Sequence, residues 1–161
     1  MSIKTTDLCD ENEDEVQIAE PVFKDLGGLK AFGGEIVTVK VHEDNVLVRG
    51  ILETEGAGRV LVVEGGGSTA CALIGDQVAQ IACDNGWAGI VVNGYIRDSV
   101  EVARIGVGLK ALGVLPKRSK KEGKGVQGVI VYFAGLVFSP GMYLYADEDG
   151  VLIADRDLLN P

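Results

Sequence analysis

The sequence predicts an α/β fold with mixed sheets, and three observations support it. Strand-like apolar runs alternate with helix-like stretches through the first part of the chain. In the last third, short apolar runs follow one another with turn residues between them, which is typical of a β meander. With 161 residues, 47% of them hydrophobic, the chain can bury one substantial core, so we expect a single domain over residues 1–161.

The first elements follow from alternation and capping residues. Residues 34–41 alternate valine with polar side chains, which predicts a half-buried strand. Asp44 stands where a helix cap is expected and Gly56 where a helix ends, so a helix is predicted over residues 45–55. Residues 59–63 then form a short apolar strand, which stops at a triple glycine.

The middle of the chain predicts a longer helical region and another strand. Helical spacing extends over residues 68–85. Gly75 is expected to break this helix, Asp76 to cap its second half and Gly86 to end it. The apolar residues 88–93 then predict a buried strand.

The remaining elements are mostly strands. A brief helix is expected at residues 99–103. The strands expected after it are residues 107–115, 129–133, 136–138, 142–146 and 151–154. Ala134-Gly135 predicts the turn of a hairpin, because glycine tolerates the positive φ that tight turns require.

Charge and hydropathy exclude several classes of protein. A net charge of −9 disfavours a surface that coats nucleic acid, which needs an excess of basic residues. The basic residues of segment 117–124 are interpreted as a solvated loop, with an RNA-contacting loop as the weaker alternative. The longest nearly apolar run, residues 128–138, is shorter than the ~20 residues of a membrane helix.

The cysteines and the N-terminal residues predict a cytoplasmic protein. Cys9, Cys71 and Cys83 form no C-x-x-C pair and no even-numbered disulfide framework, which fits a reducing compartment. The first twenty residues are acidic and lack the apolar stretch of a signal peptide.

Three kinds of site are disfavoured. Residues 65–70 satisfy G-x-G-x-x-G/A loosely, but Asn93 stands where a dinucleotide fold expects an acidic residue. His42 is the only histidine, which argues against a histidine-rich zinc site and leaves one weak candidate for a catalytic triad. A Schiff-base lysine is disfavoured because Lys40 and Lys110, which lie in expected strands, look solvent-facing.

Asp76, Arg97 and Asp98 form the most informative constellation. Both segments are expected at loop ends on the same side of an α/β layer. The free amides of Gln77 and Val78 at a helix start could bind a carboxylate, and Arg97 could contact a keto or enolate oxygen. Asp98 offers an oxygen ligand to a hard divalent cation. The alternative, a capping Asp76 with a structural Arg97-Asp98 pair, stays open from the residues alone.

The spacing of these residues resembles that of a known family. Asp76, twenty residues and Arg97-Asp98 match the D-x20-R-D motif of the RraA-like family of metal-dependent aldolases. Further segments with the same resemblance are residues 6–10, 32–34, 43–45, 62–68, 85–89 and 145–150. The family includes short-form 4-hydroxy-4-methyl-2-oxoglutarate aldolases and the regulators of ribonuclease E activity A.

The resemblance implies a fold, an assembly and a reaction. It implies a swivelling α/β/β sandwich that assembles into a homotrimeric ring. It also implies cleavage of 4-hydroxy-4-methyl-2-oxoglutarate to two pyruvates through a pyruvate enolate, with oxaloacetate decarboxylation as a side activity. The expected cofactor is a divalent cation, Mg²⁺ or Mn²⁺, because both suit carboxylate and water ligands.

Roles for individual residues come from the resemblance as well. Gly75, Asp76, Gln77 and Val78 are expected to hold the keto-acid substrate, Arg97 to contact it, and Asp98 to bind the metal. Asp76 is a catalytic candidate because it could tune a water on the metal to act as general base. An acid from a neighbouring subunit is the other candidate for the base.

A second function is known in the family, namely inhibition of ribonuclease E by protein–protein contact. Regulator-type members replace the aspartate after the arginine, whereas this chain keeps Asp98, which favours an enzyme. The chain departs from the family pattern at His42, which replaces an aromatic residue, and at Glu64, which replaces an aspartate. A glutamate beside the triple glycine could alter the rim of the pocket.

Overall fold

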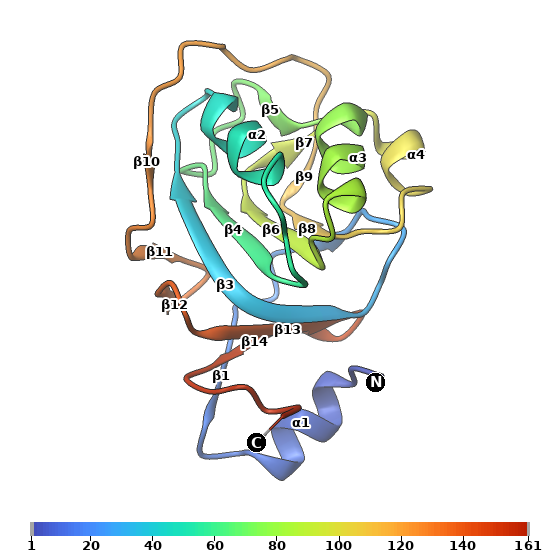
Figure 1. Ribbon diagram of the computed structural model, residues 1–161, viewed down its shortest axis with the longest axis vertical. Coiled ribbons are helices and arrows are strands. Elements are labelled where there is room, and N and C mark those ends of the chain that lie inside the picture. The colour runs from blue at the N-terminus through green and yellow to red at the C-terminus, as the bar shows by residue number, and fades with distance from the viewer. Residues whose placement is uncertain (1, 161) are drawn as a thin grey trace.

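The computed structural model describes residues 2–160, and its main feature is a long mixed sheet (Figure 1). Its parallel strands are β3 (Phe32–Lys40), β4 (Val60–Glu64), β6 (Gly89–Asn93) and β8 (Gly108–Ala111), which pair in that order. The helices α2 (Val46–Leu52), α3 (Asp76–Asp84) and α4 (Ser99–Val102) lie together on one side of these strands (Figure 1). This arrangement is the expected series of βα units.

The antiparallel strands extend the same sheet from β3. Residues 32–35 of β3 pair with β13 (Tyr143–Asp147), and residues 36–40 pair with β4, so this long strand joins the two parts. Beyond β13 lie β14 (Gly150–Ala154) and β1 (Val16–Ile18). The remaining elements are α1 (Thr5–Glu11), β2 (Lys24–Asp25), which pairs with β8, β10 (Val126–Gln127), which pairs with β3, and the hairpin of β11 (Val131–Phe133) and β12 (Leu136–Phe138).

A separate small sheet matters most for the site. It consists of β5 (Ala72–Ile74), β7 (Tyr95–Ile96) and β9 (Gly113–Val114), which are parallel and pair in that order. Each of these strands follows a strand of the main sheet after a short connection. The connections before α3 and α4 therefore start from neighbouring strands of this small sheet.

The core lies on both faces of the parallel strands. In β4, Leu61 and Val63 pack with the helices, while Val60 and Val62 pack against the C-terminal strands and the β11–β12 hairpin. All four side chains are fully buried, as expected for a parallel strand covered on both faces. The continuous apolar run that predicted this strand reflects that double coverage.

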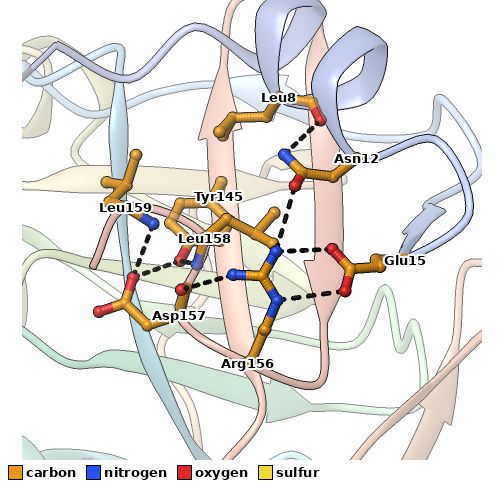
Figure 2. Close-up of polar contacts among 8 residues, drawn as sticks. All are labelled: Leu8, Asn12, Glu15, Tyr145, Arg156, Asp157, Leu158 and Leu159. Carbon is orange, nitrogen blue, oxygen red and sulfur yellow. Dashed lines mark hydrogen bonds and ion pairs between the residues drawn. The ribbon is translucent and has the colours of Figure 1, made fainter. Parts of the chain in front are cut away.

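Polar contacts hold the C-terminal segment against α1 and β13 (Figure 2). The Tyr145 hydroxyl donates to Asp157 Oδ1 at 2.8 Å and accepts the amide of Leu158 at 2.8 Å. Arg156 forms an ion pair with Glu15 at 2.7 Å and also contacts Asn12. Burial and the Asp157 carboxylate raise the pKa of Tyr145, so the hydroxyl stays protonated and able to donate.

The structure confirms the predicted fold class and most elements, but two predicted helices differ in their bounds. The hairpin turn is confirmed, because Ala134 and Gly135 both have positive φ between the paired strands β11 and β12. The expected helix over residues 68–85 is wrong in its first half, where residues 72–74 form β5. Helix α2 also ends earlier than expected, at Leu52.

A further correction concerns Lys110, which the sequence predicts to face the solvent. It is only 3% exposed, and its ammonium lies 2.7 Å from Asp25 Oδ1 and 2.6 Å from the carbonyl oxygen of Asp147. The covering segment comes from β2 and from the β13–β14 turn, which are distant in sequence. With its protons engaged in this way, Lys110 is an ion-pairing residue rather than a Schiff-base nucleophile.

Two further expectations concern the whole chain. The prediction of a single domain over residues 1–161 includes Met1 and Pro161, which lie outside the described residues, and it stays a prediction. Across residues 2–160, we find no helix with the length and apolar character needed to cross a bilayer.

Candidate functional site

The small parallel sheet brings the predicted site residues together. Ile74 of β5 pairs with Ile96 of β7, and both strands end there. The chain then continues into Gly75-Asp76 on one strand and into Arg97-Asp98 on the other. The amide of Arg97 donates to the Ile74 carbonyl at 2.9 Å, which fixes the two connections side by side. Carboxyl ends of adjacent parallel strands are a common position for sites in α/β folds.

Two carboxylates occupy the start of α3. The backbone amide of Asp76 donates to Asp98 Oδ2 at 3.1 Å, and the amide of Gln77 donates to Asp76 Oδ1 at 2.8 Å. The expectation that Gln77 presents a free amide is therefore not met here, because the Asp76 side chain occupies that amide. The backbone amide of Val78 takes part in neither of these hydrogen bonds, and the Val78 side chain is buried.

Backbone geometry holds Asp98 in place. Asp98 has φ 56° and ψ 43°, in the left-handed region that aspartate tolerates better than most residues. Gly75 leaves room for this carboxylate, because a Cβ there would stand 2.8 Å from Asp98 Oδ2 and 3.6 Å from Arg97 Nε. The structure thus places Gly75, Asp76, Arg97 and Asp98 within one contact group, as the sequence predicted.

These residues line a cavity of about 440 Å³. Its wall includes Gly75, Asp76, Gln77, Val78, Arg97 and Asp98, which are all the predicted site residues. Other lining residues come from α2, from the residues that flank it, and from residues 117–124, which we call the strap. From these segments the lining residues are Asn45, Val46, Arg49, Gly50, Glu53, Arg118, Ser119 and Lys121. A cavity of this size suits a small organic acid.

The structure confirms that residues 117–124 form an exposed loop, in which only Ser119 is buried, and adds that this loop borders the cavity. Sequence reasoning missed its role because the basic side chains show no local pattern. In Figure 1 the strap belongs to the long segment between β9 and β10, which passes over α2 and β5. The Lys117 carbonyl accepts the amide of Ala72 at 2.8 Å, and the Lys120 amide donates to the Glu43 carbonyl at 2.8 Å.

Asp44 anchors the strap to the start of α2. Asp44 is only 1% exposed. Its carboxylate accepts hydrogen bonds from the backbone amides of Val46 at 3.0 Å, Glu122 at 2.8 Å and Lys124 at 3.2 Å. Burial opposes ionisation of Asp44, but these hydrogen bonds outweigh it and lower its pKa. The residue predicted as a helix cap therefore binds the first amide of α2 and two amides of the strap.

Among the charged side chains that line the cavity, more cations than carboxylates lack an ion-pair partner. Arg49 pairs with Glu53 at 3.7 Å, whereas Arg97, Arg118 and Lys121 join no ion pair among residues 2–160. Partial burial lowers the pKa of Lys121, and repulsion from Arg97 and Arg49 adds to this. Unpaired guanidinium and ammonium groups in a concave site favour an anionic ligand.

The residues fit a hard divalent cation in one specific way. No group of three or more His, Cys, Asp or Glu side chains arranged for a metal occurs among residues 2–160, which argues against a closed zinc-type site. Mg²⁺ and Mn²⁺ instead accept one or two carboxylates and complete their shell with water and substrate oxygens. Asp98 is exposed to the cavity and can offer such an oxygen, with Asp76 beside it.

The disfavoured sites lie elsewhere. His42 has a side chain 78% exposed and contacts Glu43 at 3.4 Å. The triple glycine turns the chain between β4 and β5, with positive φ at Gly66 and Gly67. Glu64 accepts the Gly66 amide at 2.6 Å and the Asn93 amide group at 2.8 Å, so it stabilises this turn. None of these residues lines the cavity.

Known proteins with similar sequences cover nearly the whole chain. A protein of Alkalilimnicola ehrlichii is 52% identical over 159 residues, covering 99% of both chains, and one of Bacillus cereus is 52% identical over 155 residues, covering 96% of this chain and 98% of its own. Both carry the name "Putative 4-hydroxy-4-methyl-2-oxoglutarate aldolase".

Solved structures agree with this relationship. A Geobacillus kaustophilus protein, described as an S-adenosylmethionine:2-dimethylmenaquinone methyltransferase, is 52% identical with a TM-score of 0.96 and 99% of both chains covered. The RNA-processing inhibitor RraA of Thermus thermophilus is 44% identical with a TM-score of 0.92, covering 99% of this chain and 98% of its own. The model of the RraA-like family, described as Aldolase/RraA, matches residues 5–153. The chain therefore belongs to the RraA-like family, as the D-x20-R-D spacing indicated.

Proposed function

We propose that this protein is a divalent-metal-dependent aldolase that cleaves 4-hydroxy-4-methyl-2-oxoglutarate to two pyruvates, with oxaloacetate decarboxylation as a secondary activity. The observation that carries the proposal is the convergence of Arg97 and Asp98 with the start of α3 at one cavity. The names of the relatives at 52% identity support the same reaction. The substrate is a small keto acid, which matches both the size and the charge of the cavity.

The chemistry follows from where charge develops. Removal of the proton from the C4 hydroxyl lets the C3–C4 bond break, so one pyruvate leaves as the new ketone. The electron pair moves to the C2 keto oxygen and forms the enolate of the second pyruvate, which takes up a proton at C3. In this proposal Arg97 donates to that oxygen, and a donor that acts where charge appears commonly lowers the barrier by ~3 kcal/mol.

Asp76 is the candidate to position the proton acceptor. Its Oδ1 is engaged by the Gln77 amide, and the hydrogen bonds among residues 2–160 leave Oδ2 available to orient a water beside the substrate. Asp98 is the candidate ligand of the divalent cation. When bound, the cation would supply Lewis-acid polarisation of the keto group.

A coupled pyruvate assay with added Mg²⁺ tests the proposal. The wild type is expected to release pyruvate from 4-hydroxy-4-methyl-2-oxoglutarate and from oxaloacetate, and to stop when a chelator is in excess. Asp98→Ala is expected to abolish release. Asp149→Ala, in the exposed β13–β14 turn, is the matched control and is expected to retain it. Activity that persists in excess chelator would contradict metal dependence.

A second candidate function is protein-binding inhibition of ribonuclease E. It is favoured by the likeness to the RNA-processing inhibitor of Thermus thermophilus, at 44% identity. A pull-down of the ribonuclease with the wild type and with Asp98→Ala separates the two functions. Equal capture by both would support the regulator, because surface contact does not need the cavity carboxylate.

A further inference from the structure

One serine hydroxyl at the cavity has no part in the aldolase proposal. Ser119 is 6% exposed, whereas the other residues of the strap are exposed, and it still lines the cavity. Its Oγ accepts a hydrogen bond from Lys121 Nζ at 3.2 Å and makes no other hydrogen bond among residues 2–160. A hydroxyl within hydrogen-bond reach of a nitrogen base is the arrangement found in enzymes that form a covalent acyl intermediate.

A third residue orients Lys121 beside this hydroxyl. Lys121 Nζ also donates to Asn45 Oδ1 at 2.5 Å, and Asn45 Nδ2 donates to the Leu73 carbonyl at 3.0 Å. Asn45 is 7% exposed and lies directly before α2, so its amide group is held in place. Hydroxyl, base and orienting group therefore stand in the order of a catalytic triad, in which a lysine can replace the histidine.

The surroundings of Lys121 favour its neutral amine, which is the form that accepts a proton. Partial desolvation is the largest cause that lowers its pKa. Repulsion from Arg97, Arg49 and Arg118, which line the same cavity, lowers the pKa further, and Asp44 opposes this change. In the neutral amine a lone pair replaces one N–H, so the hydrogen bond between the two side chains can reverse and the serine hydroxyl can donate.

We propose that Ser119 and Lys121 form a serine–lysine dyad that hydrolyses short-chain esters and thioesters. The amine takes the hydroxyl proton while Ser119 Oγ bonds to the acyl carbon. The bond from that carbon to the leaving group then breaks, and the leaving alcohol or thiol takes the electron pair and the proton. Water attacks the acyl-serine, its proton returns through the amine to Oγ, and the carboxylic acid leaves.

The cavity can also stabilise the oxyanion of this reaction. Arg97 and Arg118 line it and join no ion pair among residues 2–160, so their guanidinium donors are available to a negatively charged oxygen. Neither Asp98 nor a divalent cation takes part in the steps of the dyad. Ester hydrolysis can therefore be measured independently of pyruvate release.

The first test is steady-state hydrolysis of 4-nitrophenyl acetate. The wild type is expected to turn over, and Ser119→Ala to lower kcat/KM by about a hundredfold. Lys121→Arg should lower it as much, because a guanidinium keeps the charge but does not act as a base. Lys124→Arg is the matched control: its side chain is 79% exposed, pairs with Glu122 and should not matter. Wild-type kinetics in Ser119→Ala or in Lys121→Arg overturn the dyad.

The pH profile of the same assay tests the base. In the wild type, kcat/KM should rise with pH as Lys121 loses its proton, and the midpoint should follow a pKa below the ordinary lysine value. This step should be absent from Lys121→Arg. An identical step in both proteins would show that another group accepts the proton and would overturn the role of Lys121.

A covalent probe and a chelator complete the test. Diisopropyl fluorophosphate should label Ser119 once, as shown by intact mass and peptide mapping, and should abolish ester hydrolysis; an unlabelled Ser119 overturns the proposal. Excess chelator should stop pyruvate release and leave ester hydrolysis unchanged. Ester hydrolysis that stops with the chelator overturns the dyad, whereas ester hydrolysis by a protein that releases no pyruvate supports the dyad and overturns the aldolase.

Discussion

At the scale of single residues, Arg97 shows why charge alone does not define the site. Its side chain lines the cavity next to Asp98 and joins no ion pair among residues 2–160. A guanidinium presents a planar fork of donors, whereas a lysine ammonium is a compact point charge. The contribution expected of Arg97 therefore lies in its geometry at the keto oxygen.

Arg97→Lys is expected to lower kcat/KM for pyruvate release by about a hundredfold, because the charge remains but the fork is lost. Steady-state kinetics with the coupled assay measure the change. Arg104→Lys, the same substitution at an exposed residue just after α4, is the control and should behave as the wild type. Wild-type kinetics in Arg97→Lys would show that only charge is required there.

Gly75 tests the position of the Asp98 carboxylate. An added Cβ at Gly75 would contact Asp98 Oδ2 and Arg97 Nε, both of which are side-chain atoms that can move without shifting the backbone. We expect Gly75→Ala to lower activity at least tenfold, with a free energy of unfolding within about 0.5 kcal/mol of the wild type. Gly106→Ala is the control, since its Cβ would meet only Cys83 Sγ at 4.0 Å. Full activity in Gly75→Ala would mean that this carboxylate position is not needed.

At the scale of elements, the strap depends on one buried carboxylate. The pKa of Asp44 is lowered, so its ionised form contributes stability above its unfolded pKa of about 3.9 and loses that contribution as the pH falls toward the lower native value. Asp44→Asn removes the charge at every pH. The wild type and this variant should therefore differ at neutral pH and converge in acid.

We expect Asp44→Asn to lower the free energy of unfolding by about 1 to 3 kcal/mol at pH 7, and the difference to shrink below about pH 4. Urea denaturation of both proteins across this pH range measures it. Asp10→Asn, at an exposed residue of α1, should show no such difference at either pH. A difference that stays constant into acid would mean that the amide hydrogen bonds to Asp44 do not depend on its charge.

Elements with a clear hydrophobic pattern could be predicted from the sequence, whereas elements defined by pairing partners far away in the sequence could not. The alternation of β3, the apolar runs of β4 and β6 and the glycine turn of the β11–β12 hairpin are local patterns. Strand β5 was mistaken for helix because a short buried apolar run fits both periods. Only its pairing with β7, more than twenty residues away, makes it a strand.

The candidate site divides in the same way. Local patterns predict Asp76 at a helix start and Arg97-Asp98 after a strand, and the structure brings these residues to one cavity. The strap residues were missed, since Lys121 meets Asn45 only through a contact that spans 76 positions of the chain. Lys110 was misplaced for the same reason, because its partner Asp25 lies on a two-residue strand with no sequence pattern of its own.

At the scale of the whole molecule, an apolar surface lies on the β11–β12 hairpin. Val131 and Phe133 face the core, while Tyr132 and Val137, which pair across the two strands, face outward and are 65% and 44% exposed. Two adjacent large apolar side chains on an acidic chain favour contact with another protein surface. We propose that the homotrimer implied by the family resemblance uses this hairpin as a contact with a second copy of the chain.

We expect light scattering after size-exclusion chromatography to give three times 16.9 kDa for the wild type, and a smaller mass for Tyr132→Glu, because burying a carboxylate in the contact is unfavourable. Tyr132→Phe keeps the apolar face and should remain a trimer. A wild-type mass of 16.9 kDa would exclude the trimer, and a trimeric Tyr132→Glu would place the contact elsewhere.

If the dissociated variant keeps its helical circular dichroism but no longer releases pyruvate, the general base comes from the neighbouring subunit. If it remains active, water oriented by Asp76 is the remaining candidate.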